Sequence, residues 1–141
     1  MLFDDLKKAK MQALKDKDVN ARSVLEAVIS RTMLQAVELK AQGKELTDTD
    51  TLTNIQKVVK ELEEEKASFA AANRIENVAS LQTQIEYISK FLPKQLSEDE
   101  IKKVILSLDD KSIPSVMKYF KTNYSGKCDM GLVSKVAKSL Q

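Results

Sequence analysis

The sequence predicts an all-α protein, with an N-terminal four-helix array before Pro93 and a C-terminal three-helix bundle after it. Only 3 glycines and 2 prolines occur in 141 residues, so few positions interrupt a helix. Apolar residues recur at spacings of three and four, which is the pattern of amphipathic helices. Charged residues make up 31% of the chain and hydrophobic residues 43%, a balance typical of a folded protein. A chain of this length forms one domain or two small ones.

Two helices are predicted before Gly43. The first covers residues 2–15, where Leu2, Leu6, Ala9 and Ala13 share one face. The second begins after Asp18 or Asn20, because both residue types are good N-caps. Gly43 follows its C-terminal end, where glycine adopts a positive φ without steric cost. The apolar stripe of the second helix contains Val24, Leu25, Val28, Ile29, Thr32, Ala36 and Leu39.

The third and fourth helices are predicted to pack as an antiparallel hairpin. Thr47 is the expected N-cap of the third helix, with Asp50 as the acid of a capping box. Asn73 is expected to end it, because asparagine tolerates the left-handed region. A joint this short favours antiparallel packing of the two helices. Their apolar stripes contain Leu52, Ile55, Val59, Leu62 and Phe69 in the third, and Val78, Leu81, Ile85, Ile88 and Leu92 in the fourth.

The joint after Pro93 divides the predicted fold. Proline lacks an N–H group and disfavours α geometry in the residue before it, so the fourth helix should end here. Ser97 and Glu100 have the spacing of a capping box, which predicts that a new helix begins at once. We therefore expect two domains, covering residues 1–93 and 94–141.

Three shorter helices are predicted in the second domain. The first covers residues 98–108, the second begins near Ser112 with Pro114 in its first turn, and Asp129 caps the third. Because helices this short are unstable alone, we expect them to pack together as a bundle. Their apolar faces contain Ile101, Val104, Ile105 and Leu108, then Val116, Met117 and Phe120, then Leu132, Val133, Val136, Ala137 and Leu140.

Positive charge is concentrated toward the C-terminal end. Residues 1–89 contain 13 Lys and Arg against 15 Asp and Glu, whereas residues 90–141 contain 10 Lys against 6 Asp and Glu. Lysines on small helices often serve only to keep a surface soluble, but they also neutralise phosphates, and Tyr119 and Tyr124 lie among them, where they can stack on bases. The candidate RNA-binding residues are Lys111, Lys118, Lys121, Lys127, Lys135 and Lys138.

The chain lacks the residues of the common catalytic sites. It contains no histidine, which excludes Ser-His-Asp and Cys-His arrangements and the usual zinc ligands. The single cysteine, Cys128, follows Lys127 and precedes a helix, a setting that can lower a thiol pKa, but no histidine is present to act as its base. Glu61 and Glu64 lie one turn after Lys57 and Lys60, which indicates exposed ion pairs. We expect no catalytic residue, metal site or cofactor.

The sequence also favours a cytoplasmic location. One cysteine cannot form an internal disulfide, which is typical of a reducing compartment. The first residues contain no apolar run, so we expect no signal peptide. No stretch approaches the roughly 20 apolar residues of a membrane span, and we expect no membrane partner.

Several local strings resemble the GatB/YqeY family along essentially the whole chain. Residues 87–101, YISKFLPKQLSEDEI, are similar to the most specific signature of this family. Residues 43–48 resemble its turn before the third helix, and residues 126–129, followed by Leu132 and Val133, resemble its ending. Two departures, Pro114 and a short segment between Met117 and Gly126, fall on the middle helix of the second domain.

The resemblance implies kinship with the tail domain of the B subunit of the glutamine-dependent aminoacyl-tRNA amidotransferase. That tail is understood to hold tRNA while other domains carry out the chemistry. The family label, a carbon–nitrogen ligase with glutamine as amido-N-donor, implies an activity for which this sequence offers no glutaminase nucleophile. We therefore expect an accessory protein that binds tRNA or other RNA. The alternative is a non-catalytic interaction module that docks on an amidotransferase or aminoacyl-tRNA synthetase subunit through exposed apolar helix faces.

Overall fold

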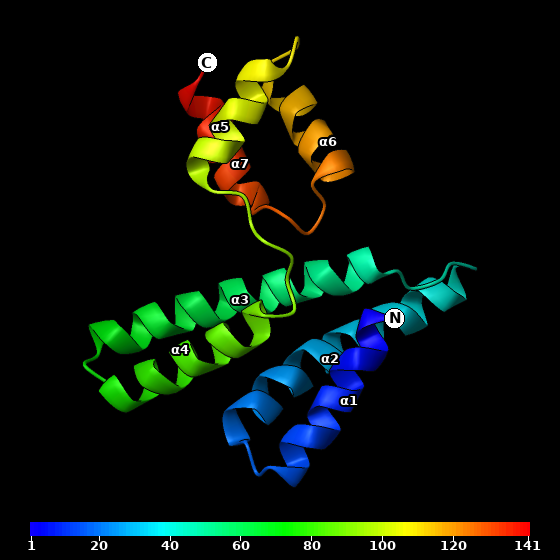
Figure 1. Cartoon of the computed structure of the whole chain (residues 1–141), viewed down its shortest axis with the longest axis vertical. Coiled ribbons are helices and arrows are strands. Elements are labelled where there is room, and N and C mark those ends of the chain that lie inside the picture. The colour runs from blue at the N-terminus through cyan, green and yellow to red at the C-terminus, as the bar shows by residue number, and fades with distance from the viewer. The chain divides into compact units, whose positions relative to one another are not determined.

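The computed structural model describes residues 1–141, and all its regular elements are helices (Figure 1). This confirms the all-α prediction. The chain divides into two compact units, Met1–Phe91 and Leu92–Gln141, which we describe separately. The helices are α1 (Leu2–Lys15), α2 (Val19–Ala41), α3 (Asp48–Ala71) and α4 (Ile75–Ser89) in the first unit, and α5 (Glu98–Ser107), α6 (Ile113–Asn123) and α7 (Met130–Ser139) in the second.

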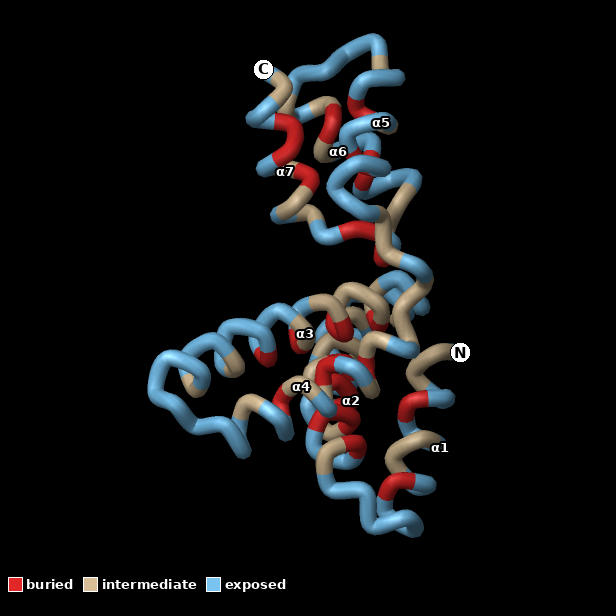
Figure 2. The backbone as a smooth tube through the Cα atoms, turned by 60° about the vertical axis from the view of Figure 1, so that its left-hand side comes forward, coloured by how far each residue is buried: buried red, intermediate tan, exposed pale blue.

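Helix α2 lies at the centre of the first unit. It packs against α1, α3 and α4, while α3 and α4 form the expected hairpin. Because α2 is central, it contributes more buried residues than any other helix of the unit (Figure 2). The buried side chains of α2 are Ala21, Val24, Leu25, Val28, Ile29 and Thr32.

The first three helices end in the same type of turn. Each is followed by a residue with positive φ, at 55° for Lys17, 74° for Gly43 and 57° for Asn73. After α2, the N–H of Gly43 donates to the carbonyl of Lys40 (3.0 Å) and that of Lys44 to Leu39 (2.8 Å), which is a Schellman motif. The predictions at Gly43 and Asn73 are confirmed, whereas the turn at Lys17 was not anticipated.

The buried face of α3 differs from the predicted stripe. Thr51, Asn54 and Val58 are buried, while Leu52 and Val59 are only half-buried. The reason is that α3 packs against α1, α2 and α4, so that its buried face is wider than a single seam. Position-by-position hydrophobicity therefore misplaced the centre of this face.

Helix α4 ends earlier than its apolar pattern indicated. The helix stops at Ser89, and Lys90 and Phe91 continue in a turn whose N–H groups donate to Tyr87 (3.3 Å) and Ile88 (3.1 Å). Leu92 therefore lies outside the helix. Proline restricts the residue before it, so the loss of helical geometry begins before Pro93 itself.

The second unit has its own hydrophobic core. Helix α7 packs against both α5 and α6. The predicted capping box is present at the start of α5: the N–H of Glu100 donates to Ser97 Oγ (3.2 Å), and the N–H of Ser97 donates to Glu100 Oε1 (3.1 Å). The core contains Ile101, Ile105, Val116, Phe120, Cys128, Val133, Val136 and Ala137.

Helix α6 is regular despite the two departures noted in its sequence. Pro114 lies in its first turn, where a missing N–H breaks no helical hydrogen bond. The side chain of Ser112, the N-cap, makes no capping bond. The start of α6 is held by the carboxylate of Asp110 instead, which accepts hydrogen bonds from Ser112 N (2.9 Å) and Ser115 Oγ (2.7 Å). These bonds lower the pKa of Asp110 from its usual 3.8 to about 2.

No helix in either unit has both the length and the apolar character that crossing a bilayer requires.

Candidate nucleic-acid interface

All six lysines that we proposed from the sequence as RNA-binding residues are exposed in the structure. None of them forms a salt bridge, so their charges are not neutralised by a nearby carboxylate. Lys111 is the one whose ammonium group bonds the protein, because its Nζ donates to the carbonyl of Leu108 (2.6 Å). The six are Lys111 in the α5–α6 loop, Lys118 and Lys121 on α6, Lys127 in the α6–α7 loop, and Lys135 and Lys138 on α7.

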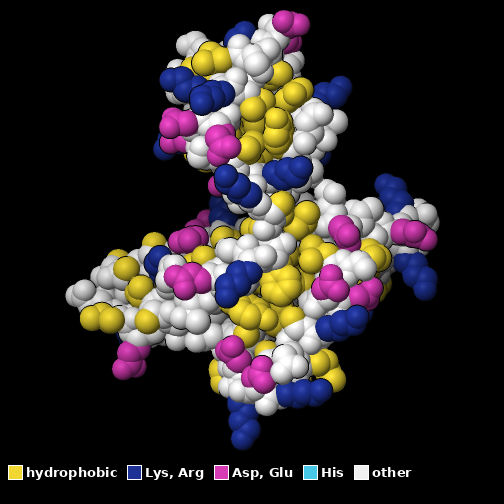
Figure 3. All heavy atoms as spheres, viewed as in Figure 1, with side chains coloured by type: hydrophobic (Ala, Val, Ile, Leu, Met, Phe, Trp, Pro, Cys, Tyr) yellow, Lys and Arg dark blue, Asp and Glu magenta, His cyan; other side chains and the backbone are white.

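Four of these lysines form two pairs. Lys118 and Lys121 are three residues apart on α6, as are Lys135 and Lys138 on α7, a spacing that places side chains side by side on a helix surface. In the view of Figure 3, the basic side chains of this unit lie at several of its edges, with hydrophobic and acidic side chains between them. The basic charge is thus divided into local groups on the visible face.

The loop that carries Lys127 is held by backbone contacts. The carbonyl of Lys127 accepts from Leu96 N (2.8 Å), and the N–H of Lys127 donates to Tyr124 O (2.9 Å). Gln95 Nε2 donates to the carbonyl of Gly126 (2.8 Å), and Gly126 has φ of 76°, which only glycine adopts without cost. The loop therefore has a defined conformation, while the Lys127 side chain remains exposed.

The two tyrosines among the lysines have different environments. Tyr119 on α6 is 37% exposed, whereas Tyr124 is half-buried against the ring of Phe120, with centroids 5.4 Å apart. Beside Tyr119 is a shallow hollow of about 290 Å³, which is lined by Ser115, Lys118, Tyr119, Thr122 and Asn123. Sequence analysis treated the two rings alike, because only the packing of the folded unit decides which one is exposed.

Cys128 is a core residue. Its side chain is 2% exposed and belongs to the hydrophobic core of the second unit. Burial and the charge of Asp129 raise the pKa of the thiol, so the position of Cys128 beside Lys127 and before α7 does not activate it. A buried thiol with a raised pKa is a poor nucleophile.

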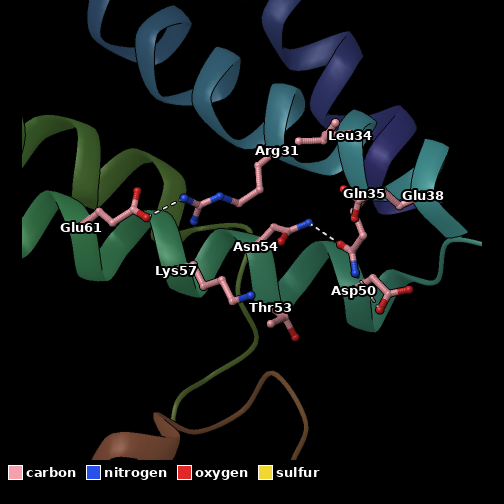
Figure 4. A pocket seen from close by; sticks show the side chains of 9 residues that line it. All are labelled: Arg31, Leu34, Gln35, Glu38, Asp50, Thr53, Asn54, Lys57 and Glu61. Atoms are coloured by element: carbon pink, nitrogen blue, oxygen red, sulfur yellow. Dashed lines mark hydrogen bonds and ion pairs between the residues drawn. The ribbon is translucent and has the colours of Figure 1, made fainter.

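A second hollow, of about 480 Å³, lies between α2 and α3 in the first unit (Figure 4). Asn54 joins the two helices, donating from Nδ2 to Thr32 Oγ1 (3.2 Å) and to Gln35 Oε1 (2.8 Å). Because Asn54 and Thr32 are buried, these bonds satisfy polar groups that would otherwise be costly. The hollow is lined by Arg31, Leu34, Gln35, Glu38, Asp50, Thr53, Asn54, Lys57 and Glu61.

An ion pair between helices forms in place of one predicted within a helix. Glu61 pairs with Arg31 of α2, and neither Lys57–Glu61 nor Lys60–Glu64 forms a salt bridge. The reason is that α2 lies along this face of α3 and presents a guanidinium there, which the helical spacing of α3 alone does not reveal. Nη1 of Arg31 is buried without a hydrogen-bond partner.

No group of three or more Cys, Asp and Glu side chains is arranged to hold a metal ion. Two of the carboxylates around the α2–α3 hollow are used in protein contacts: Glu61 binds Arg31, and Asp50 binds the backbone of Thr47 (2.9 Å) in the capping box of α3. These bonds join α2 to α3 and cap α3, so we assign them to the fold.

An apolar surface is exposed on the C-terminal half of α2. Met33, Leu34 and Val37 are 52%, 64% and 67% exposed. Their spacing places them on one side of the helix, away from the face that packs into the core. Scattered exposed apolar residues are ordinary, but neighbouring ones are typical of surfaces that contact a partner.

A family model described as Yqey-like protein matches residues 3–140. The match extends from α1 to the end of α7 and so includes both compact units. No curated protein matches the chain.

Proposed function

The chain belongs to the YqeY-like protein family, and from this premise we propose that it is an accessory protein whose C-terminal unit binds tRNA or another structured RNA. The observation that carries the proposal is the set of six exposed lysines, none of which forms a salt bridge. The resemblance to a tail domain that holds tRNA supports the same interpretation. A cytoplasmic location is part of the proposal.

The proposed mechanism is phosphate neutralisation. A lysine ammonium is a compact charge on a flexible stem, which suits phosphate binding but not bidentate recognition of a base. Each phosphate that is neutralised releases condensed counterions, and this release drives binding in a salt-dependent way. We therefore expect recognition of RNA shape, with little dependence on sequence.

The proposed role is non-catalytic. Amide transfer from glutamine needs an activated nucleophile to release ammonia. The only thiol of the chain is the buried Cys128, and the chain has no histidine to activate a serine or threonine hydroxyl. The protein is thus proposed to bring or hold RNA rather than modify it.

The salt dependence of tRNA binding tests this proposal. Full-length protein is titrated with labelled tRNA at several salt concentrations, and log K should fall with log[salt] with a slope of about −0.7 to −0.9 per phosphate contacted. The double variants Lys118→Gln/Lys121→Gln and Lys135→Gln/Lys138→Gln should each make the slope shallower by about one to two.

The control for these variants is Lys57→Gln/Lys60→Gln. These lysines are also exposed, also three residues apart and also on a helix, but they lie in the first unit. The control should bind tRNA as the wild type does. A flat salt dependence, or equal losses in the control and the C-terminal variants, would contradict the proposal.

The exposed apolar side chains on α2 favour a second candidate function. Here the protein docks on an amidotransferase or aminoacyl-tRNA synthetase subunit through Met33, Leu34 and Val37, which are all more than half exposed. Val37→Lys should then abolish capture of that subunit. Met11→Lys, at an exposed methionine on α1, is the matched control. Capture that disappears when RNA is digested would contradict direct docking.

A further inference from the structure

Tyr119 is the only exposed aromatic side chain of the protein. The other six aromatic residues are buried or half-buried, whereas Tyr119 is 37% exposed on the outer part of α6. An aromatic ring has a large apolar face, and leaving part of it in water forgoes some of the stabilisation that its burial provides. The exposed ring is therefore available to a ligand.

The protein fixes the position of this ring. The ring of Tyr119 meets that of Phe120 in an edge-on contact, with centroids 6.1 Å apart and planes at 79°. It also contacts Tyr124 at 6.3 Å. Phe120 is fully buried in the core of the unit. One side of Tyr119 is thus held by the aromatic core, which reduces the entropy lost when a ligand packs on it.

Polar groups and a positive charge surround the exposed part of the ring. The hollow beside Tyr119 is lined by Lys118, Thr122 and Asn123 on the same helix. The hydroxyl of Ser115, which also lines the hollow, is already bonded to Asp110 (2.7 Å). Asn123 Nδ2 donates to the backbone carbonyl of Tyr119 (3.0 Å). An aromatic face beside an unneutralised lysine matches the two parts of a nucleotide, its base and its phosphate.

We propose that Tyr119 is a stacking platform for one unpaired nucleobase, with Lys118 contacting the adjoining phosphate. The inference rests on the proposed function, because it names the part of the RNA that the C-terminal unit contacts. Aromatic side chains stack on any base whose face is free. Bases within a duplex are covered by their neighbours, so sequence-tolerant stacking of this kind requires a loop, bulge or single-stranded end.

The test uses full-length protein and two RNA hairpins that differ in the position of a single 2-aminopurine, which fluoresces less when it is stacked. One hairpin carries the probe in its loop and the other in its stem. Wild-type protein should change the fluorescence of the loop probe and leave the stem probe unchanged. Tyr119→Leu keeps an apolar side chain against Phe120 but removes the ring, and Tyr119→Phe restores it.

The expected result separates stacking from charge. Tyr119→Leu should lose the loop signal and bind the loop hairpin roughly 5- to 150-fold more weakly, since stacking on an aromatic side chain contributes that much per base. Its salt slope should equal that of the wild type, because no phosphate contact is removed. Tyr119→Phe should retain both the signal and the affinity.

Two contrary results are distinguishable. If Tyr119→Leu binds the loop hairpin with unchanged affinity and signal while binding stays salt-dependent, the stacking site is wrong and the proposed function stands. If wild-type protein binds neither hairpin nor tRNA in a salt-dependent way, the proposed function fails and the stacking site fails with it. Far-UV circular dichroism confirms that the variants are folded.

Discussion

Removing the ring of Phe120 should unfold the C-terminal unit while leaving the N-terminal unit folded. Phe120 is fully buried and is the largest of the fully buried side chains. Phe→Ala substitutions in protein cores cost about 3–5 kcal/mol. The unit has only 50 residues, and at about 0.05–0.15 kcal/mol per residue its whole stability is roughly 2.5–7.5 kcal/mol. At the middle of both ranges, Phe120→Ala removes about 4 of about 5 kcal/mol, which is most of that stability.

Circular dichroism gives the size of the expected change. Helices α5, α6 and α7 contain 10, 11 and 10 residues, against 14, 23, 24 and 15 in α1 to α4. Phe120→Ala should thus lower the helical signal at 25 °C by about three-tenths and leave the remainder to melt cooperatively at higher temperature.

The reciprocal variant is Leu25→Ala, at a fully buried position of α2. It should lower the melting temperature of the larger part of the signal, with little effect on the smaller part. Loss of the entire signal in one transition for either variant would refute independent folding of the two units. An unchanged signal in Phe120→Ala would refute the packing argument.

Three further predictions concern local structure. Ser97→Ala removes the capping box of α5 and should lower the free energy of unfolding of the C-terminal unit by about 0.5–2 kcal/mol in urea titrations; an unchanged midpoint would mean that the cap contributes nothing. Lys17→Gly removes the steric strain of a side chain at φ of 55° and should raise the free energy of unfolding of the N-terminal unit by up to about 1 kcal/mol. Its melting temperature should rise accordingly, and a lower melting temperature would contradict this. The pKa of Asp110 is lowered from its usual 3.8 to about 2 in the folded state, so the carboxylate stabilises the fold at pH values above 3.8. This stabilisation is lost as the pH falls toward about 2. Asp110→Asn should therefore show a shallower acid dependence of unfolding in this range, and an unaltered profile would refute the assignment.

Local signals in the sequence were sufficient for most helix boundaries. The start of α3 is marked by Thr47 and Asp50, and that of α5 by Ser97 and Glu100, and both capping boxes form. Such signals work because the groups that bond are three residues apart and need no distant partner. The end of α2 at Gly43 has the same local origin.

Features that depend on distant neighbours were not predicted. Glu61 bonds to Arg31, which is 30 residues away, and the burial of Asn54 depends on the approach of Thr32 and Gln35 from α2. Periodicity describes one helix at a time, so it does not indicate which side a neighbouring helix will cover. The same limit explains why the buried face of α3 was misplaced.

The candidate site was predictable in part. Composition identified the lysines, since a count of charges needs no fold, and the structure confirms that they are exposed. Their division into pairs on α6 and α7, and the difference between Tyr119 and Tyr124, depend on how the two helices pack around Phe120. That packing is a property of the folded unit rather than of any short stretch of sequence.

Mapping the RNA contact on the full-length protein tests the central proposal most directly. Backbone amide resonances are recorded by NMR while unlabelled tRNA is added. The account predicts that the largest changes fall on α6, α7 and the loops that carry Lys111 and Lys127. Changes confined to α2 and α3, or no changes at all, would contradict it.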